Sequence, residues 1–289
     1  IIDKRHIIRY VSTAFLKLTG LSRMETHHQP IQTLENTLTL PEVPNADFSL
    51  NAHGVVESEL ECVDANGQVH WLSSSISLLW SESREISNYV ITFEDITEYK
   101  AYQTKMEQIA LYDALTGLEN RVLFQRQLEK VISNVQRNAT RTALLFIDID
   151  DFKLINDSFG HETGDFVLKT VAQRLTAHVR KNDSVFRVSG DEFIILLNEL
   201  QVYDHASKVT QQIIDAFKKP VIENEREIFV TVSVGISVTP DDSIKSSELI
   251  HNADLAMYRA KQNGRNNFQF FCEEMNAELR HKKLIETEL

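Results

Sequence analysis

The pattern of apolar residues changes near residue 113, and this change limits the folds that the chain can adopt. Before it, three β-prone runs at positions 54–63, 69–79 and 88–94 are separated by turn residues. The turn between the first two runs contains Asn66 and Gly67, a pair that tolerates positive φ and favours a tight hairpin. We therefore expect an antiparallel sheet in the first hundred residues.

After residue 113, segments with helical periodicity alternate with short strands. The expected helices cover 119–137, 164–181, 203–219 and 246–263, the last ended by Gly264, and the expected strands cover 142–149, 185–188, 193–197, 228–238 and 266–271. The fold class is therefore α+β. We expect a ferredoxin-like sandwich with helices on one side of a largely antiparallel sheet.

A helix between these regions carries the apolar residues Tyr99, Tyr102, Met106 and Ile109. Their spacing of three, four and three is typical of the seam of a coiled coil, along which two copies of the chain could pair. The alternative is a connector helix whose apolar side packs against its own domain. We expect the homodimer.

Composition limits the class of protein. With 289 residues, of which 42% are hydrophobic and 25% charged, the chain is long enough for two soluble globular domains. A formal charge of −12 argues against a nucleic-acid binder. Cys62 and Cys272 lack the spacing of a zinc site or a disulfide framework. No signal peptide or membrane span is evident, so we expect a cytoplasmic location and no membrane contact, with any anchor elsewhere in a longer parent protein.

Two groups of acidic residues point to chemistry. Asp148 and Asp150 end an apolar strand and project to the same face, where like charges need a divalent cation or hydrogen-bond donors. Asp191 and Glu192 follow Gly190 at the tip of the expected hairpin, where glycine leaves room for a phosphate chain. Taken singly, the first group is better explained as a solvated strand end and the second as an ordinary turn.

Seven motifs in order resemble the GGDEF family of diguanylate cyclases over residues 111–271. They occupy residues 113–121, 148–157, 160–161, 164–165, 189–193, 234–237 and 253–266. Residues 1–98 resemble the PAS sensory family more loosely, at positions 1–20 and 93–97. The resemblance implies a PAS-like antiparallel sheet domain at 1–98, a helical signalling linker at 99–112 and a nucleotidyl-cyclase-type α/β sandwich at 113–271. Residues 272–289 resemble the start of a linker to an EAL-like domain outside this chain.

The resemblance also implies the activity, the joining of two GTP molecules into cyclic di-GMP with release of two pyrophosphates. Magnesium, or manganese in its place, would be held by Asp148, the carbonyl of Ile149 and Asp191. Glu192 and Asp191 would be catalytic, because they assist removal of the proton from the attacking 3′-hydroxyl. The PAS-like domain would gate this activity, and the sequence identifies no cofactor for it.

The resemblance implies that the remaining site residues bind nucleotide. Three cations would neutralise the triphosphate: Lys153, which belongs to the catalytic set, Lys261 and Arg265. Lys261 and Arg265 lie four residues apart and are expected on one side of a helix end. Gly190 and His161 would be further substrate-binding positions.

Asn156 and Asp165 would select guanine. A carboxylate accepts from the N1 and N2 hydrogens of guanine, whereas adenine has no donor at either place. For each of these two residues alone, a helix cap is the alternative. Arg180 and Asp183 match the family's inhibitory product site, so cyclic di-GMP is expected as a feedback inhibitor.

One position departs from the family's signature, because Ser189 stands where glycine is usual. If that position needs positive φ, serine would be strained by about 1 kcal/mol. Ser189 therefore supports a second hypothesis, a catalytically silent GTP-binding module that regulates a neighbouring EAL phosphodiesterase. We favour the active enzyme, because the other signature residues are intact.

Overall fold

The computed structural model describes residues 1–36, 55–64, 66–138, 140–200 and 203–275. The chain divides into two compact units, Ile1–Glu107 and Gln108–Leu289, which are described separately. Residue 54, the first position of an expected strand, lies outside the described residues. So do residues 276–289, which make up most of the segment expected to lead into another domain. Within the described part, no helix combines the length and the apolar character needed to span a bilayer.

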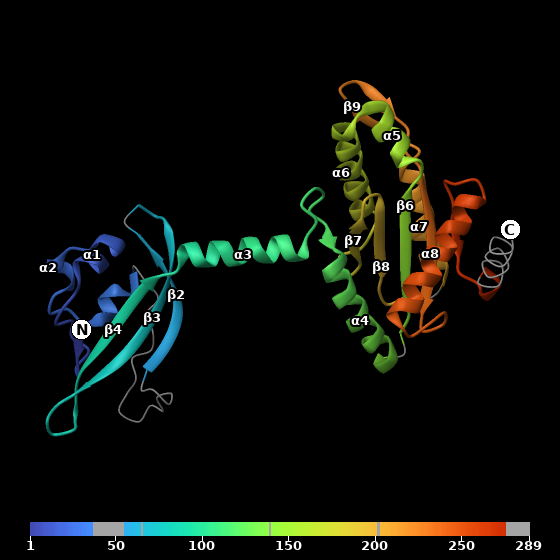
Figure 1. Ribbon diagram of the computed structural model, residues 1–289. Coiled ribbons are helices and arrows are strands. Elements are labelled where there is room, and N and C mark those ends of the chain that lie inside the picture. Colours follow the sequence, from blue (N-terminus) through green and yellow to red (C-terminus); the bar gives the residue numbers. More distant parts are fainter. Residues whose placement is uncertain (37–54, 65, 139, 201–202, 276–289) are drawn as a thin grey trace, which may run out of the picture. The chain divides into compact units, whose positions relative to one another are not determined.

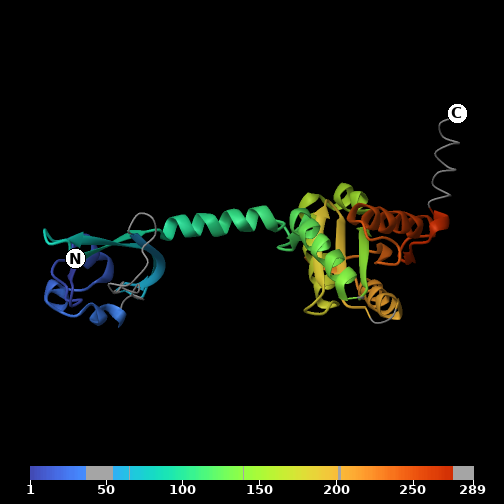
Figure 2. The ribbon, with the colours of Figure 1, turned by 90° about the horizontal axis from the view of Figure 1, so that it is seen from below.

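The first unit is a four-stranded antiparallel sheet with short helices on one face (Figures 1 and 2). Its elements are β1 (Ile2–Asp3), α1 (Thr13–Thr19), α2 (Arg23–Thr26), the 3-10 helix η1 (Ile31–Asn36), β2 (Val55–Val63), β3 (Val69–Trp80) and β4 (Ile86–Asp95). The sheet order is β1-β4-β3-β2, so the antiparallel sheet expected from the sequence is confirmed. The β2–β3 hairpin turns at Gly67, where φ is 81°.

A cavity of about 580 Å³ lies in the first unit, lined by α1 and β4. Most of its lining is apolar, including Ile8, Phe15, Leu18 and Phe93. Asp95, the last residue of β4, also lines this cavity.

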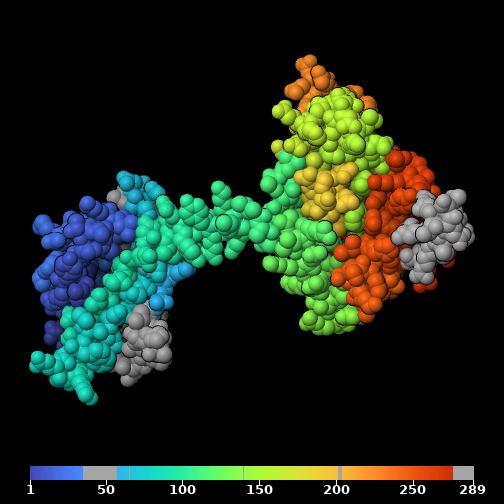
Figure 3. Space-filling model, in the orientation of Figure 1, coloured from blue at the N-terminus to red at the C-terminus, as the bar shows by residue number. Residues whose placement is uncertain are grey.

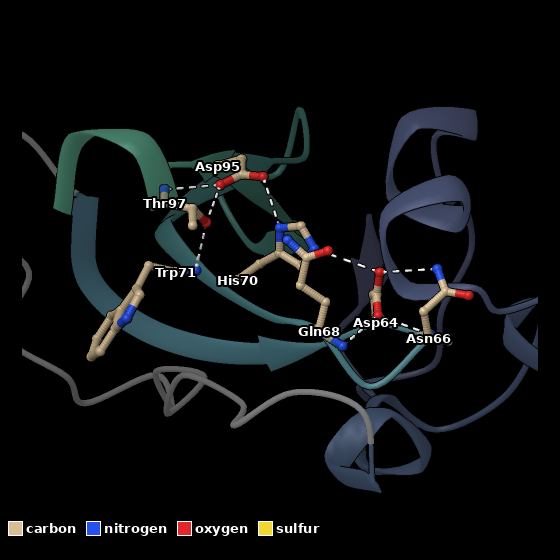
Figure 4. Close-up of polar contacts among 7 residues, drawn as sticks. All are labelled: Asp64, Asn66, Gln68, His70, Trp71, Asp95 and Thr97. Carbon is tan, nitrogen blue, oxygen red and sulfur yellow. Dashed lines mark hydrogen bonds and ion pairs between the residues drawn. The ribbon is translucent and has the colours of Figure 1, made fainter. Parts of the chain in front are cut away.

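Asp95 joins the sheet to the linker helix through a network of hydrogen bonds (Figure 4). Its carboxylate accepts from the backbone N–H of Thr97 at 2.9 Å and from the Thr97 hydroxyl at 2.5 Å. The Thr97 hydroxyl oxygen in turn accepts from the backbone N–H of Trp71 in β3 at 2.9 Å. The ring of His70 stands between two carboxylates, with Nδ1 3.2 Å from Asp95 and Nε2 3.7 Å from Asp64 in the hairpin turn. Strands β3 and β4 together therefore hold the start of the linker helix.

The linker helix α3 (Thr97–Leu111) has no buried residue. Tyr99, Tyr102, Met106 and Ile109 are each 64–68% exposed. These side chains are therefore not packed against the sheet of the first unit, and pairing of the stripe with a second copy stays a prediction.

The second unit contains a six-stranded sheet with helices on both faces (Figures 1 and 2). Its elements are β5 (Glu119–Asn120), α4 (Arg121–Asn138), β6 (Thr142–Ile149), α5 (Phe152–Phe159), α6 (His161–Ala177), β7 (Ser184–Ser189), β8 (Glu192–Leu197), α7 (Tyr203–Ala216), β9 (Val221–Glu223), β10 (Arg226–Ile228), β11 (Val232–Thr239), α8 (Ser246–Gln262) and β12 (Phe268–Phe270). Strands β9 and β10 form a separate hairpin, and the main sheet runs β12-β11-β6-β8-β7-β5.

The central strands confirm the expected α+β fold class. Strands β11, β6, β8 and β7 are antiparallel neighbours, the order of a ferredoxin-like core, whereas β12 and β5 add to its edges in parallel. The expectation that all helices lie on one side of the sheet was wrong. Helices α5, α6 and α7 pack on one face, α4 and α8 cover the other, and every residue of β6 is buried between them.

Two other local expectations were wrong. Helix α5 was not expected, and the strand expected at 228–238 is interrupted between β10 and β11. Phe229 lies in this interruption with 70% of its surface exposed. A side chain so exposed gives no burial energy to extend the strand.

Candidate functional site

An acidic pair lies where β6 and β8 run side by side. Asp148 near the end of β6 and Glu192 at the start of β8 are register partners, so their side chains emerge on the same face of the sheet. This is the face covered by α8, whose Lys261 places Nζ 2.7 Å from Oδ1 of Asp148. Asp148 is only 7% exposed, so this charge is largely removed from water.

The charges at this place are not balanced. Burial raises the pKa of Asp148, Lys261 lowers it, and the charges of Asp191 and Asp150 raise it again, for a net increase. Burial also raises the pKa of Glu192, with further increases from Asp148, Asp254 and Asp191. A surplus of negative charge at a partly buried place favours a cation there.

The hairpin turn beside this pair is open. Gly190 has φ of 36°, and a Cβ added to it would meet nothing within 4 Å. The turn is tied to the sheet by the backbone N–H of Ile149, which donates to the carbonyl of Asp191 at 3.3 Å. In Figure 3 the segment around this hairpin reaches the surface between the α5–α6 segment and α8. Ser189 does not have positive φ, so serine is not strained at the departing position.

Sequence reasoning missed Arg187, which holds this turn. Its Nε and Nη2 donate to the carbonyl of Gly190 at 3.0 and 2.7 Å, and its Nη1 donates to Oδ1 of Asp113 at 2.9 Å. Thr116 donates to the same Asp113 oxygen through its N–H and hydroxyl. Burial alone would raise the pKa of Asp113, but the bonds from Thr116 and Arg187 outweigh it and the pKa is lowered. Arg187 thus connects the loop after α3 to the signature turn.

A divalent cation fits the chemistry of this end of β6. The groups there that could bind a cation are carboxylate and carbonyl oxygens, the ligands that hard divalent cations prefer. A bound cation would also neutralise the surplus negative charge of the carboxylates. No three His, Cys, Asp or Glu side chains of the described residues converge closely enough to hold a metal. A cation would therefore need the carbonyl of Ile149 and ligand oxygens as well as Asp148 and Asp191. Asp150, which the sequence paired with Asp148, instead accepts three hydrogen bonds from neutral donors.

The three expected cations differ in their surroundings. Lys261 reaches Asp148, as described above. Arg265 lies beyond the end of α8 with φ of 60°, so the expected placement on one side of a helix end was wrong. Its Nε nevertheless lies 3.6 Å from Oδ1 of Asp151, at the same end of β6. Lys153 is exposed in the first turn of α5.

Helices α5 and α6 bring the two expected guanine-binding residues close together. A Cβ at Gly164 would lie 1.9 Å from Oδ1 of Asn156, so glycine lets the Asn156 side chain lie against α6. Asp165 follows directly and is exposed, as is His161 at the start of α6. The N-caps of α5 and α6 are Asp151 and Gly160, so the helix-cap alternative is wrong for Asn156 and Asp165. The nucleotide-binding roles of all three stay predictions.

A separate groove of about 620 Å³ surrounds Arg180. Asp183 accepts from the backbone N–H of Arg180 and of Asn198, both at 3.0 Å, so it shapes the loop. The side chain of Arg180 is exposed, and His205 and Lys208 of α7, which the sequence did not indicate, also line the groove.

Family models match both halves of the chain. The model described as diguanylate cyclase, GGDEF domain, matches residues 110–267, more than half of the chain. A PAS domain model matches residues 1–98.

Curated relatives are longer proteins. A bifunctional diguanylate cyclase/cyclic di-GMP phosphodiesterase, MucR of Pseudomonas aeruginosa, is 41% identical over 170 residues, which is 59% of this chain and 25% of that protein. The cyclic di-GMP phosphodiesterase NbdA of the same organism is 38% identical over 185 residues, 64% of this chain and 23% of that protein. The probable diguanylate cyclase DgcE of Escherichia coli is 30% identical over 271 residues, 91% of this chain and 24% of that protein. The chain thus spans about a quarter of the length of these relatives.

Solved structures resemble the second unit. The GGDEF domain of TpbB from Pseudomonas aeruginosa is 33% identical, with a TM-score of 0.57 over 58% of this chain and 99% of that one. The GGDEF domain of DgcB from Caulobacter crescentus, determined in complex with c-di-GMP, is 27% identical, with a TM-score of 0.52 over 56% of this chain and 95% of that one.

Proposed function

Because the chain belongs to the GGDEF family of diguanylate cyclases and carries a PAS domain at its N-terminus, we propose that it condenses two GTP molecules into cyclic di-GMP under control of that PAS domain. The observation that carries the proposal is the pairing of Asp148 with Glu192 beside the open turn at Gly190. Relatives named as diguanylate cyclases, such as DgcE, support it.

In the proposed reaction, the 3′-hydroxyl oxygen of one GTP attacks the α-phosphorus of another. A phosphorus–oxygen bond forms, the bond to pyrophosphate breaks, and the leaving group takes the electron pair. The hydroxyl proton passes to Glu192, whose raised pKa suits a general base. A second attack in the reverse direction closes the ring.

Charge stabilisation supplies most of the remaining catalysis. Asp148, Asp191 and the carbonyl of Ile149 would hold magnesium, or manganese in its place, which when bound supplies positive charge against the phosphates. Lys261, Arg265 and the exposed Lys153 add to this charge from the protein.

Asn156 and Asp165 select the base. An acid that finds no donor on adenine is left unpaired, which costs about 1–3 kcal/mol and favours GTP over ATP.

Each cyclase unit holds one of the two reacting nucleotides, so the reaction needs two copies of the chain. The exposed stripe of α3 is the surface that would join them. Met106→Glu should lower turnover and leave GTP affinity nearly unchanged, because a charge in the seam opposes pairing. Thr104→Glu, at an exposed position outside the stripe, is the matched control. A large loss of GTP affinity in Met106→Glu would contradict the dimeric mechanism.

The direct test is to incubate the purified chain with GTP and magnesium and to separate the nucleotides by chromatography. Cyclic di-GMP should form with the native chain and not with Glu192→Gln. Failure of the native chain to form product while it binds GTP as a dimer would refute the cyclase.

That result would favour a second candidate, a silent GTP-binding module that regulates a neighbouring phosphodiesterase. Serine at position 189 suggested this candidate from the sequence, but it is not strained in the structure. The remaining support is a relative named as a phosphodiesterase that aligns over 185 residues.

The groove at Arg180 is the proposed inhibitory product site. Arg180 offers a planar fork of donors suited to phosphate or guanine, and Lys208 adds positive charge. Added cyclic di-GMP should inhibit the native chain and Lys169→Ala, which changes an exposed residue of α6 outside the groove lining, but not Arg180→Ala. Equal inhibition of all three would exclude this groove.

A further inference from the structure

Asp150 is a buried acid that the proposed reaction does not use. It is 6% exposed, and both of its oxygens accept hydrogen bonds. Oδ1 accepts from the hydroxyl of Ser233 at 2.6 Å, and Oδ2 accepts from the hydroxyl of Thr231 at 2.7 Å and from the backbone N–H of Asn266 at 3.1 Å. These donors supply the compensation that a buried carboxylate requires.

The bond to Asn266 reaches an unusual turn after α8. Gly264, Arg265 and Asn266 have φ of 101°, 60° and 50°, three consecutive residues in the left-handed region. Each non-glycine residue there costs about 1–2 kcal/mol, more for arginine than for asparagine. Such a conformation persists only when neighbouring groups hold it.

Two side chains hold this turn through different backbone groups. Asp150 binds the N–H of Asn266, as described. Asn267 donates through Nδ2 to the carbonyls of Ala260 and Arg265, both at 2.8 Å. The N–H of Arg265 also donates to the carbonyl of Ala260 at 3.2 Å, which ties the turn back to the last turn of α8.

The held turn determines where Arg265 lies. Because Arg265 lies outside α8, the direction of its side chain is not fixed by helix geometry. Its Nε is nevertheless 3.6 Å from Asp151, next to Asp150 in the chain. One loop after β6 therefore supplies both the carboxylate that holds the turn and the carboxylate that the arginine faces.

We propose that Asp150 is a positioning residue, which acts through the turn at 264–266 to hold Arg265 where it meets the triphosphate of bound GTP. The proposal rests on the proposed function, since GTP binding at this end of β6 belongs to that function. The proposal gives the two acidic residues at the end of β6 different roles: Asp148 faces the ligand, and Asp150 holds part of the protein.

The experiment compares variants of the 289-residue chain by two readouts. The first is limited trypsin cleavage after Arg265 in the absence of nucleotide, which reports the turn whether or not the chain binds GTP. The second is GTP affinity by calorimetry in the presence of magnesium.

Asp150→Ala should speed cleavage after Arg265 and weaken GTP binding by about tenfold, the effect of about one lost hydrogen bond. Asp150→Asn should stay near the native values. Its amide oxygen still accepts from the N–H of Asn266, and the Ser233 hydroxyl can turn to accept from the new amide. Thr231→Val is the matched control, because it removes one hydroxyl and leaves the bond to the turn.

Double variants separate positioning from a general loss of structure. If Asp150 acts through Arg265, Asp150→Ala should weaken GTP binding no further in a chain that already carries Arg265→Ala. Asn267→Ala, which removes the other side-chain bonds to the turn, should behave like Asp150→Ala and replaces it if that variant does not fold.

Three results would overturn the inference. One is unchanged trypsin cleavage after Arg265 in both Asp150→Ala and Asn267→Ala. This result can be observed whether or not the chain binds GTP. Another is faster cleavage with unchanged GTP affinity. The third is a loss of affinity from Asp150→Ala that multiplies with the loss from Arg265→Ala. If the native chain binds no GTP, the proposed function itself fails, and the native protein alone reveals it.

Discussion

Replacing Arg187 with methionine should destabilise the second unit by about 2–3 kcal/mol. The substitution removes a charged hydrogen bond to Asp113 between partly buried partners, which contributes about 1.5–3 kcal/mol. It also removes two bonds to the carbonyl of Gly190, but Gly190 is exposed and water can replace those donors. Asp113 keeps both bonds from Thr116, and methionine keeps much of the apolar stem, so neither adds greatly to the cost.

The unfolding of the two units can be followed separately. Trp71 and Trp80, the two tryptophans of the chain, both lie in the first unit, so tryptophan fluorescence reports that unit. The second unit contains the helices α4 to α8, and far-ultraviolet circular dichroism follows them. In urea, Arg187→Met should shift the dichroism transition and leave the fluorescence transition in place.

The exposed Arg126 of α4 provides the matched control, and Arg126→Met should change the free energy of unfolding by less than about 0.5 kcal/mol. Combining Arg187→Met with Asp113→Asn should give a coupling energy of about 1 kcal/mol or more, because the two side chains are in contact. The reasoning is refuted if Arg187→Met shifts the transition no more than Arg126→Met.

Three further predictions concern other parts of the molecule. Ser189→Gly should change the rate of cyclic di-GMP formation by less than about threefold, because Ser189 is exposed and unstrained; a tenfold increase would show that serine impairs the turn. Gly235→Ala should destabilise the second unit by about 3 kcal/mol, since the new Cβ would lie 1.9 Å from a backbone oxygen of α8; an unchanged urea midpoint would contradict this. The pKa of Asp64 is lowered by hydrogen bonds, first from Gln68, and that of Asp95 first by the bond from Thr97. The two lowered pKa values stabilise the first unit above about pH 4, and this stabilisation is lost as the pH falls through them. Melting temperatures followed by tryptophan fluorescence should therefore drop on acidification. The drop should be smaller in Asp95→Asn.

The parts of the fold that were predicted correctly are those encoded by continuous apolar patterns. Strand β6 has the expected bounds because residues 142–149 form one apolar run that ends in acidic residues. The same run also indicated helices on both faces, because a strand buried on both sides reads as continuously apolar rather than alternating. That inference was available from the sequence and was not drawn.

The parts that were missed depend on contacts between distant residues. Arg187 meets Asp113 across 74 positions, and Asp150 meets Asn266 across 116. No local pattern predicts such pairs, because tertiary packing brings them together. Helix α5 was missed for a different reason: it is short, and its N-cap Asp151 has a φ of 53°, which is unusual for an N-cap residue.

The double contact of Asp95 has a thermodynamic consequence for the first unit. The same residue lines the cavity and caps the first turn of α3, so the cavity and the helix share one hydrogen-bonded group. Linkage between two such events is reciprocal. If two copies pair along α3 as proposed, a molecule that shifts Asp95 on entering the cavity would change the free energy of helix pairing, and pairing would change the affinity of the cavity by the same factor. The concentration of the chain itself would then set how strongly the first unit binds such a molecule.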